Sequence, residues 1–474
     1  MKRHRTSQRV IRIALGVAAL LALVVTPQVA EAREGKLDPS FGEGGLVQTN
    51  LKLSESGQVV VARDGGVLLN RGRLLTRYLS NGQLDPEFGE GGRLSLDQFY
   101  ATKLEGLELY PGPIALDSKG RMIVFGGASD PNRVFFEPTA FLSAQSSWAV
   151  VLRLMPDGKL DTSFGGGDGY IRSDFGIASS FETDVPLVEI ANGRVDSRDR
   201  PVLLLSSAAF TGRCNYGHTS ITGHPRAVVR LTEDGSTDAT FGGGDGVSPV
   251  YGVEWISDLE LDGADQPVVA VPTENCKKGG NRIFRLGADG EALPGFGPGG
   301  KYYPGFYFSL IVPGGQLILQ RGELRAEAVA RTDSAGTLDP TFGVNGVAQV
   351  KMPRGANRRL RPVGVDAQGR IILVGSLSFP LPRQHSKTKA VHHSKKRRPS
   401  RSYVVVTRLT PSGKTDLSFG NQGWITTRFN RPQHLQIDGA SLDPQGRLVV
   451  EVGSNDARQK PGTHVVLARY LLDS

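Results

Sequence analysis

The stretch LDTSFGGGDG, residues 160–169, recurs along the chain with small changes. Five further copies read LDPSFGEGG (37–45), LDPEFGEGG (84–92), TDATFGGGDG (237–246), LDPTFGVNG (338–346) and TDLSFGNQG (415–423). A seventh copy, ALPGFGPGG (292–300), has Leu293 where the other copies have Asp. The repeat has to be interpreted before any single motif, because its period indicates the architecture.

The spacing inside the repeated unit is constant. Each Phe-Gly pair begins with one of Phe41, Phe88, Phe164, Phe241, Phe296, Phe342 and Phe419. An Arg stands eleven residues before six of these Phe, at Arg77, Arg153, Arg230, Arg285, Arg331 and Arg408. Arg469 stands near the end of the sequence in a similar apolar run. Three residues before the Phe stands one of Asp38, Asp85, Asp161, Asp238, Asp339 and Asp416. This spacing predicts an Arg–Asp pair across a tight turn in each repeat, with Arg469 pairing with Asp38 across the two ends of the sequence. Arg285 should find another partner, because its repeat has Leu293 in place of the Asp.

Each repeat also has a front half in which two apolar runs flank a polar turn, as in PIALDSKGRMIVFGG (113–127). Runs of about five apolar or β-branched residues between Gly, Asp and Ser turns predict antiparallel strands. One repeat therefore supplies four strands. Seven such units predict an all-β, seven-bladed β-propeller with four antiparallel strands per blade.

The two ends of the sequence favour a closed ring over a linear solenoid. The first repeat residues, GKLDPSFGEGGLVQT (35–49), and the last, HVVLARYLLDS (464–474), are complementary halves of one unit. Pairing the N-terminal strand with the C-terminal strands would close the ring and remove the exposed edges that an open solenoid keeps.

These motifs resemble the delta-60 repeat of bacterial secreted proteins, and the first three strands of each unit are similar to NHL-type propeller blades. The resemblance extends over the chain after residue 32. It implies the propeller fold and export, and it transfers no catalytic residue, because the family as such has no defined ones.

Residues 1–32 look like a secretory signal peptide. A basic start, the apolar run 13–25 and the Ala30-Glu31-Ala32 site have the expected order. We expect a single propeller domain, residues 33–474, that is secreted or held at the cell surface and is monomeric. An uncleaved anchor is the alternative for the first segment.

The formal net charge of +9 is unevenly distributed. The segment 377–401 holds eight Lys or Arg and no acid, and without it and the leader the chain has a net charge of about −3. This argues against the extended basic face of a nucleic-acid-binding protein. We expect the segment to be an inserted cationic loop that adds nothing to the fold and contacts anionic polymers through Lys395, Lys396, Arg397 and Arg398.

The glycine-rich stretch itself is interpreted as structural. It lacks the Lys and hydroxyl residue of a phosphate-binding loop, and it does not recur in tandem as calcium-binding repeats do. Phe is expected to pack between blades, Gly to take left-handed turn positions, and Asp to accept hydrogen bonds.

What differs between repeats is the link between the second and third strands. It is short at 71–73 and long at 128–147, 208–224, 273–280, 377–401 and 455–463. In an antiparallel blade these links share one face with the links between blades. Variable loops on a rigid scaffold are a natural place for binding, so we expect ligands on this face.

The cysteines Cys214 and Cys276 fall in two successive links of this kind. The oxidising environment outside the cell favours disulfide formation, so a disulfide between them is predicted, with two free thiols as the alternative. The preferred binding patch is the neighbouring surface of Asn215, Tyr216 and His218.

Two classes of function stay open at this level. The leading hypothesis is a non-catalytic exported propeller, without a cofactor, that binds a glycan, peptide or anionic surface polymer. The alternative is a metal-dependent, lactonase-like hydrolase with calcium at the channel mouth, held by Glu182, Asp184, Glu254 and Asp258. Binding leads because no catalytic motif is found, and a fold alone establishes no activity.

Overall fold

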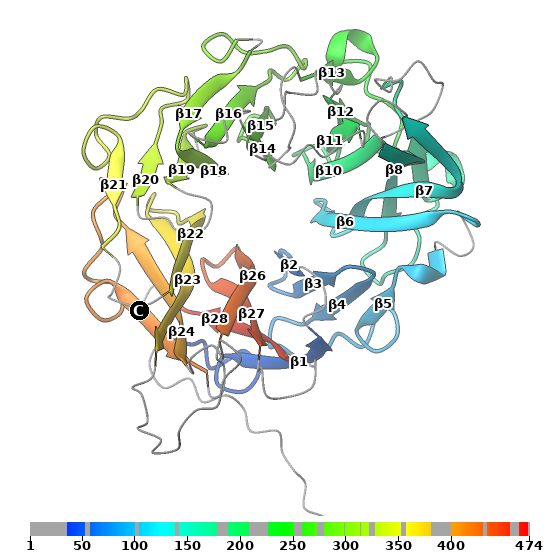
Figure 1. The fold of residues 1–474 in the computed structure, drawn as a ribbon. Coiled ribbons are helices and arrows are strands. Elements are labelled where there is room, and N and C mark those ends of the chain that lie inside the picture. Colours follow the sequence, from blue (N-terminus) through cyan, green and yellow to red (C-terminus); the bar gives the residue numbers. More distant parts are fainter. Residues whose placement is uncertain are drawn as a thin grey trace, which may run out of the picture.

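The computed structural model describes residues 36–52, 57–99, 104–137, 142–177, 188–207, 226–250, 258–272, 279–297, 299–312, 314–321, 328–351, 357–380, 400–429, 434–455 and 464–472. These residues form a ring of seven four-stranded antiparallel sheets (Figure 1). The predicted seven-bladed β-propeller is therefore confirmed.

The strands run from the axis of the ring outward in each blade. In blades 1 to 4 they are β2 (Gly57–Val61), β3 (Val67–Arg71), β4 (Leu74–Tyr78) and β5 (Arg93–Ser95); β6 (Glu108–Leu116), β7 (Met122–Glu137), β8 (Leu142–Leu154) and β9 (Tyr170–Ser173); β10 (Val188–Val195), β11 (Pro201–Ser207), β12 (Arg226–Arg230) and β13 (Val247–Pro249); β14 (Asp258–Leu261), β15 (Pro267–Pro272), β16 (Gly280–Arg285) and β17 (Lys301–Pro304).

In blades 5 to 7 the strands are β18 (Phe306–Ile311), β19 (Leu317–Arg321), β20 (Ala328–Arg331) and β21 (Val347–Gln349); β22 (Asn357–Val365), β23 (Ile371–Pro380), β24 (Ser400–Leu409) and β25 (Trp424–Arg428); β26 (His434–Leu442), β27 (Leu448–Asn455), β28 (His464–Tyr470) and β1 (Leu46–Lys52). Two 3₁₀ turns, η1 (Gly165–Gly167) and η2 (Gly242–Gly244), lie in the glycine-rich stretches.

The hydrophobic core lies between the blades. Each pair of neighbouring blades shares one cluster of buried aliphatic and aromatic side chains, and the cluster between blades 7 and 1 closes the series. The repeat Phe belong to these clusters; Phe41, Phe164 and Phe241, for example, are fully buried. The expectation that Phe packs between blades is confirmed.

The repeat Arg joins its own blade to the next one. In blade 3, Nε of Arg230 donates to Asp238 Oδ2 at 2.8 Å, and Nη2 donates to the Thr240 hydroxyl at 3.0 Å. Nη1 donates to the carbonyl of Ala288, in blade 4, at 2.6 Å. The guanidinium also lies 4.5 Å from the centre of the Phe241 ring. We call this arrangement the arginine latch.

The latch recurs around the ring. The predicted Arg–Asp pairs form in the other blades with separations of 2.7 to 3.0 Å between Nε and Oδ2, at Arg77–Asp85, Arg153–Asp161, Arg331–Asp339, Arg408–Asp416 and Arg469–Asp38. Arg285, which lacks the repeat Asp, pairs with Asp262 and donates to the carbonyl of Ser334 in blade 5. The predicted pairing is confirmed, including the exception.

In five blades the glycine after the repeat Phe adds a backbone link to the next blade, at Gly42, Gly89, Gly165, Gly242 and Gly343, whereas Gly297 donates to Leu293 of its own turn. Gly242 has a φ of 65°, in the left-handed region, and its N–H donates to the Asp289 carbonyl of blade 4 at 2.8 Å. A Cβ at this position would overlap the backbone of Val247. The glycine is therefore required by the turn and by the close approach of strands, and the stretch is a structural element.

Ring closure joins the two ends of the chain. β1 pairs antiparallel with β28, so the N-terminal strand completes blade 7 (Figure 1). Nε of Arg469 donates to Asp38 Oδ2 at 2.7 Å, and the Asp38 N–H donates to the Arg469 carbonyl at 2.9 Å. The predicted closure of the ring is confirmed.

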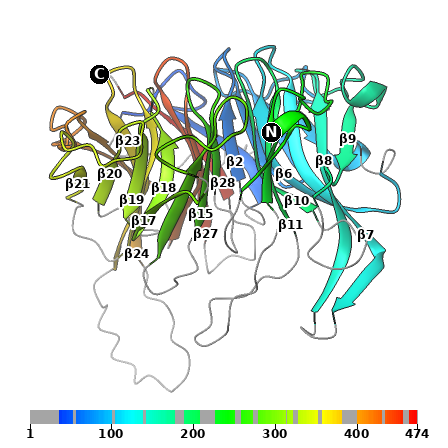
Figure 2. The same cartoon turned by 90° about the horizontal axis from the view of Figure 1, so that it is seen from above.

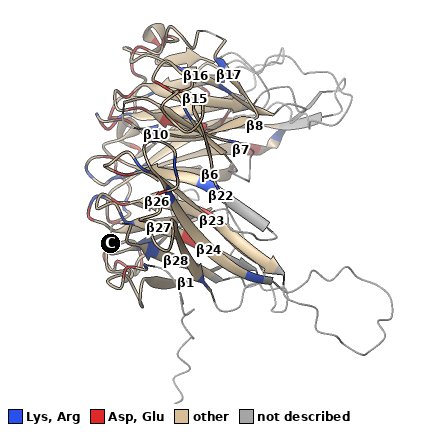
Figure 3. Ribbon diagram, turned by 90° about the vertical axis from the view of Figure 1, so that its left-hand side faces the viewer, with Lys and Arg blue, Asp and Glu red and all other residues tan. Residues whose placement is uncertain are grey.

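The ring has two different faces. The turn face carries the tight first–second and third–fourth strand turns of each blade, including the latches; Lys, Arg, Asp and Glu all occur along it (Figure 3). The loop face carries the other links. The β7–β8 hairpin projects from the loop face as a two-stranded arm (Figure 2), with pairing as far as Glu137 and Leu142. The link expected at 128–147 is thus largely strand.

The strands of blade 6 extend into the predicted cationic loop. Leu377 pairs with Tyr403 and Pro380 with Ser400, so the ends of the segment 377–401 belong to β23 and β24. Leu377 is 2% exposed and packs in the core between blades 5 and 6. The expectation that the whole segment adds nothing to the fold is wrong at this end. Residues 381–399, with Lys395, Lys396, Arg397 and Arg398, lie outside the described residues.

Within the described residues, no helix is long and apolar enough to cross a membrane.

Replacing Arg230 with Ala should lower the free energy of unfolding by about 2 kcal/mol or more, because the hydrogen bonds to Asp238, Thr240 and the Ala288 carbonyl would be lost and Asp238 would keep Arg200 as its one arginine partner. Arg282→Ala is the matched control, since Arg282 makes an exposed hydrogen bond to the Gly299 carbonyl. Its effect should stay within about 0.5 kcal/mol. Guanidinium denaturation of both variants measures the difference, and equal losses would contradict the latch.

Asp238 should determine part of the acid sensitivity. Burial opposes ionisation, but hydrogen bonds from Thr240 and Arg230 outweigh it and lower the pKa of Asp238 to about 2. A carboxyl whose pKa is lower in the folded state stabilises fully above its unfolded pKa of 3.8 and loses this effect as the pH falls toward 2. Asp238→Asn should therefore be less stable at neutral pH and lose less stability between pH 4 and 2. Asp245→Asn, on the following turn, is the control; an unchanged acid profile for Asp238→Asn would contradict the assignment.

Candidate functional site

Four polar side chains meet between the innermost strands of blades 3 and 4. Asn192 and Arg194 come from β10, and Asp258 and Glu260 come from β14. Because alternate residues of a strand point to the same side, each strand contributes an i, i+2 pair while Leu259 between them is buried. We call this group the inner-strand cluster.

Arg194 is the centre of the inner-strand cluster. Its Nη2 donates to Glu260 Oε1 at 2.5 Å and its Nε to Oε2 at 3.1 Å, and Nη2 lies 3.6 Å from Asp258 Oδ1. Asn192 Nδ2 donates to the same Asp258 oxygen at 2.7 Å. The arginine and both acids retain between a quarter and a third of their side-chain exposure, which leaves the cluster partly accessible.

The inner-strand cluster holds one carboxyl group that titrates near neutrality. Loss of hydration raises the pKa of Asp258 to about 7, with a further contribution from the negative charge of Glu260 and an opposing one from Arg194. Such a group can take up or release a proton at physiological pH. The guanidinium beside it disfavours a bound metal cation, since like charges repel at this distance.

The predicted metal site is only partly covered by the structure. Asp258 lies in the inner-strand cluster, whereas Glu182, Asp184 and Glu254 lie outside the described residues. Among the residues that the structure describes, no three His, Cys, Asp or Glu side chains are arranged to hold a metal ion. Sequence reasoning missed Asn192, Arg194 and Glu260, although the alternating polar residues of two inner strands were a usable signal.

A pocket of about 620 Å³ opens between blades 1 and 2 at the loop-face end of β2 and β6. It is lined by Gly57, Gln58, Asn70, Gly72, Arg73, Leu109, Tyr110, Pro111, Gly112 and Pro113. We call it the rim pocket. It lies at the end of β3, where the short link 72–73 leaves room beside the strands.

Two amide side chains of blade 1 hold the wall of the rim pocket. Gln58 exchanges two hydrogen bonds with the backbone of Ile114, at 2.8 and 3.0 Å, and Asn70 Nδ2 donates to the Gly112 carbonyl at 3.0 Å. These contacts fix the irregularity in β6 between Pro111 and Ile114. Asn70 is 6% exposed, and its Oδ1 has no hydrogen-bond partner among the described residues.

The edge of the rim pocket carries exposed polar groups of both kinds. Arg73 pairs with Asp97 at 2.9 Å and donates to the Leu109 carbonyl at 2.8 Å, with 49% of its side chain exposed. Tyr110 is 53% exposed and donates its hydroxyl to Glu108 at 3.1 Å. Exposed pairs of this kind contribute little to stability and can exchange partners with a ligand.

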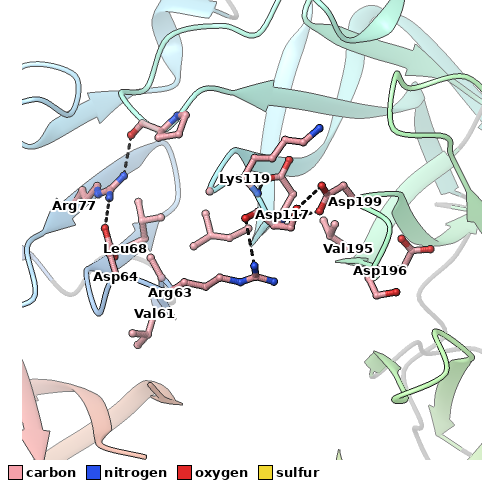
Figure 4. A pocket seen from close by; sticks show the side chains of 16 residues that line it. Val61, Arg63, Asp64, Leu68, Arg77, Asp117, Lys119, Val195, Asp196 and Asp199 are labelled. Atoms are coloured by element: carbon pink, nitrogen blue, oxygen red, sulfur yellow. Dashed lines mark hydrogen bonds and ion pairs between the residues drawn. The ribbon is translucent and has the colours of Figure 1, made fainter. Parts of the chain in front are cut away.

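A second pocket, of about 580 Å³, lies on the turn face between blades 1, 2 and 3 (Figure 4). Its polar groups contact one another: Arg77 bonds to Asp64 at 2.9 Å, and Ser118 donates its N–H and hydroxyl to the two Asp199 oxygens, each at 2.6 Å. Asp199 has a φ of 61° and occupies a turn position at which Gly120 stands in blade 2. The Ser118–Asp199 contacts join blades 2 and 3, and Arg77 also donates to the Pro156 carbonyl of blade 2 at 3.0 Å, so we interpret this pocket as structural.

The other residues singled out from the sequence are not covered. Asn215, Tyr216 and His218, together with Cys214 and Cys276, lie outside the described residues. The disulfide and the binding patch beside it therefore stay predictions.

Comparisons with known proteins agree with the propeller fold and go no further. A family model described as a domain of unknown function (DUF5122) β-propeller matches residues 141–164, which cover β8 and the first part of one glycine-rich turn. A search of curated proteins found no significant match. The match is too short to establish the family for the whole chain, and the likeness to the delta-60 repeat stays a resemblance.

Solved structures similar to this chain are distant in sequence. A gluconolactonase from Xanthomonas campestris is 12% identical, with 90% of this chain and 98% of that chain covered and a TM-score of 0.31. The PQQ-bound aldose sugar dehydrogenase from Streptomyces coelicolor is 12% identical, with 81% and 98% covered and a TM-score of 0.34. A protein of unknown function from Dyadobacter fermentans is 10% identical, with 90% and 100% covered and a TM-score of 0.36. Such likenesses transfer no activity.

Asp258 should make stability depend on pH near neutrality. Its pKa of about 7 in the folded state lies above its value of 3.8 in the unfolded chain, so the folded state binds the proton more tightly and loses stability as the pH rises between these values. Asp258→Asn should remove this loss, gaining stability relative to the native chain at pH 8 more than at pH 4. Denaturant unfolding at several pH values measures it, with Asp289→Asn on the turn face as the control. A parallel profile for native protein and Asp258→Asn would contradict the shift.

Proposed function

We propose that the protein is an exported, non-catalytic β-propeller that binds a glycan on its loop face, with the rim pocket as a principal contact. The observation that carries the proposal is the composition of that pocket. It combines the amides of Gln58 and Asn70, the exposed guanidinium of Arg73 and the half-exposed Tyr110.

This set of side chains suits a hydroxyl-rich ligand. A sugar hydroxyl both donates and accepts hydrogen bonds, and the pocket edge offers donors and acceptors side by side in the Arg73–Asp97 and Tyr110–Glu108 contacts. Tyrosine supplies an apolar ring surface with a polar end, which fits the alternating apolar and polar surfaces of a sugar ring. Charge of a single sign, which would favour an anionic polymer, is not a feature of this edge.

The difference between the two faces supports the same assignment. On the turn face, many polar side chains already make hydrogen bonds within and between blades, in the arginine latches and in the Ser118–Asp199 contact. On the loop face, the links vary in length from blade to blade, and variable links on a rigid scaffold are available for recognition.

The metal-dependent hydrolase is the second hypothesis. Asp258, with its pKa near neutrality, is the observation in its favour. The contact with Arg194 weighs against a metal ion at this residue, since the guanidinium already provides the positive charge. We therefore place binding first.

The test is calorimetric titration with hexasaccharides of glucose (α- and β-linked), xylose, mannose, N-acetylglucosamine and galacturonate, with polyglutamate as an anionic polymer that is not a glycan. At least one hexasaccharide should bind. Arg73→Ala and Tyr110→Ala should each weaken that binding about tenfold, the loss expected for one hydrogen bond to a charged group or one aromatic contact.

Arg63→Ala is the matched control, because Arg63 is an exposed arginine on the turn face. It should leave the affinity unchanged. Binding of polyglutamate without any hexasaccharide would indicate an anionic-polymer receptor instead, and equal losses in all three variants would contradict the rim pocket as the site.

A further inference from the structure

Three charged side chains lie buried between blades 7 and 1, directly behind the wall of the rim pocket. They are Arg71 at the end of β3, Asp438 on β26 and Glu451 on β27. We call them the acid cluster. Asn70 and Gly72, the neighbours of Arg71 in the chain, both line the rim pocket, so the two sites share one wall.

Glu451 breaks the pattern of the repeat. In each blade the repeat Arg, on the third strand, pairs with a residue of the second strand. The residue two positions further along the second strand points toward the next blade. Phe125 and Val374 are apolar at this position, and Phe125 packs against Gly193 of the next blade. Blade 7 has Glu451 there, and blade 1 has Asn70. The two seams on either side of β2 and β3 therefore both carry a polar side chain at this position; blade 5 has Gln320 there, and Glu451 is the ionisable residue among those compared.

The charges of the acid cluster do not balance. Nη1 of Arg71 contacts Glu451 Oε1 and lies 3.5 Å from Asp438 Oδ2, so two carboxylates share one guanidinium nitrogen. The side chains of Glu451, Asp438 and Arg71 are 0%, 4% and 5% exposed. Glu451 Oε2 and Asp438 Oδ2 have no hydrogen-bond donor among the described residues. These three side chains thus carry one negative charge in excess. The Arg361 guanidinium, 3.1 Å from the Asp438 carbonyl, offsets part of the charge of Asp438, so the unfavourable buried charge is that of Glu451 unless a proton removes it.

The groups around Glu451 make it the carboxyl that holds this proton. Burial raises the pKa of Glu451 to about 7, Arg71 opposes the rise, and Asp438 adds to it. Asp438 has other contacts: Gln436 donates to its Oδ1 at 2.5 Å, and Arg361 of β22 donates to its carbonyl at 3.1 Å. On β4, Tyr78 is the remaining titratable group near Glu451; burial and the charge of Glu451 both raise the pKa of that phenol.

The contact that couples the acid cluster to the rim pocket is made by Gly57. The Glu451 carboxyl packs on this glycine so closely that a methyl group there would overlap both carboxyl oxygens. Gly57 also lines the rim pocket and precedes Gln58, which holds β6. Any displacement of the Glu451 carboxyl toward water therefore moves the strand on which the pocket is built.

We propose that Glu451 is a proton switch for the rim pocket: as a neutral acid it packs on Gly57 and leaves Arg71 and Asp438 as a single ion pair, and on ionisation it pushes β2 and β3 away and weakens binding. The proposal rests on the glycan-binding function only for its last step. Binding is therefore tighter on the acid side of neutrality, and a bound glycan holds the proton on Glu451 more firmly.

The first test uses the protein without any ligand. Amide hydrogen exchange, corrected for its intrinsic pH dependence, is followed in peptides covering residues 57–71 at pH 5.5 and pH 8. Exchange in the native chain should be severalfold faster at pH 8. In Glu451→Gln, which keeps the shape of the neutral acid, it should change less than twofold.

Two further variants keep this test decisive. Asp438→Asn removes the repulsion that favours the neutral form, so Glu451 should ionise against Arg71 alone and the pH effect should shrink even if Glu451→Gln does not fold. Glu189→Gln is the control: Glu189 is an exposed acid on the inner strand of blade 3, loss of hydration raises its pKa, and its strand pairs with β11. It should keep the native pH response of residues 57–71. Equal pH responses in the native chain and Glu451→Gln would overturn the proposal.

The second test measures the hexasaccharides named above at pH 5.5 and pH 8. Affinity of the native chain should fall about five- to tenfold at the higher pH, and that of Glu451→Gln should not change. A pH-dependent exchange without any hexasaccharide binding would leave the switch standing and contradict the glycan function. Hexasaccharide binding with the same pH dependence in native protein and Glu451→Gln would contradict the switch and leave the function standing.

Discussion

The arginine latch is the interaction on which the ring depends. Each latch places one guanidinium between a carboxylate of its own blade and a carbonyl of the next blade; Arg153, Arg230, Arg331 and Arg469 also donate to a hydroxyl of the turn. In five blades the guanidinium also lies over the face of the repeat Phe. A guanidinium presents five N–H donors in a fixed plane, which lets one side chain hold both the turn and the neighbouring blade. Because each guanidinium has a carboxylate partner, its burial does not leave the uncompensated charge that would destabilise an interior. Closure follows when the last latch, at Arg469, meets Asp38 from the first residues of the ring.

The use of one face for the latches has a consequence for function. Turns that carry Arg, Asp and Gly in fixed positions cannot vary without loosening a blade interface, so variation is confined to the opposite face. The rim pocket lies at that face, between blades 1 and 2, where the short link after Arg71 leaves the ends of the strands open. Its neighbour, the acid cluster, lies one seam away, and both depend on polar residues that replace apolar ones of the repeat. The proposed recognition and its proposed control by pH are thereby joined through a single pair of strands, β2 and β3.

The inner-strand cluster shows a different use of buried charge. Arg194 joins two carboxylates on an inner strand, and the group remains partly exposed toward the axis. In the acid cluster the same ratio of two acids to one arginine is almost completely buried, and two carboxyl oxygens lack donors. Both triads hold a carboxyl whose pKa is raised to about 7, and exposure to water decides how well its ionised form can be hydrated without movement of the surrounding strands.

Repetition made the fold predictable from the sequence. The spacing of Arg, Asp, Phe and Gly determined the four strands of a blade, the number of blades, the pairing of Arg with Asp and the closure by the terminal strands, because each of these follows from local periodicity applied many times. The strand ends were less predictable: Leu377 and Pro380 continue β23, since pairing with β24 buries Leu377 in a way that local composition does not reveal. The rim pocket and the acid cluster could not be derived at all, and of the inner-strand cluster only Asp258 was singled out. Arg71 lies hundreds of positions before Asp438 and Glu451 and the three follow no motif. Only the packing of blade 7 against blade 1 brings their charges together and removes the water that would otherwise keep them apart.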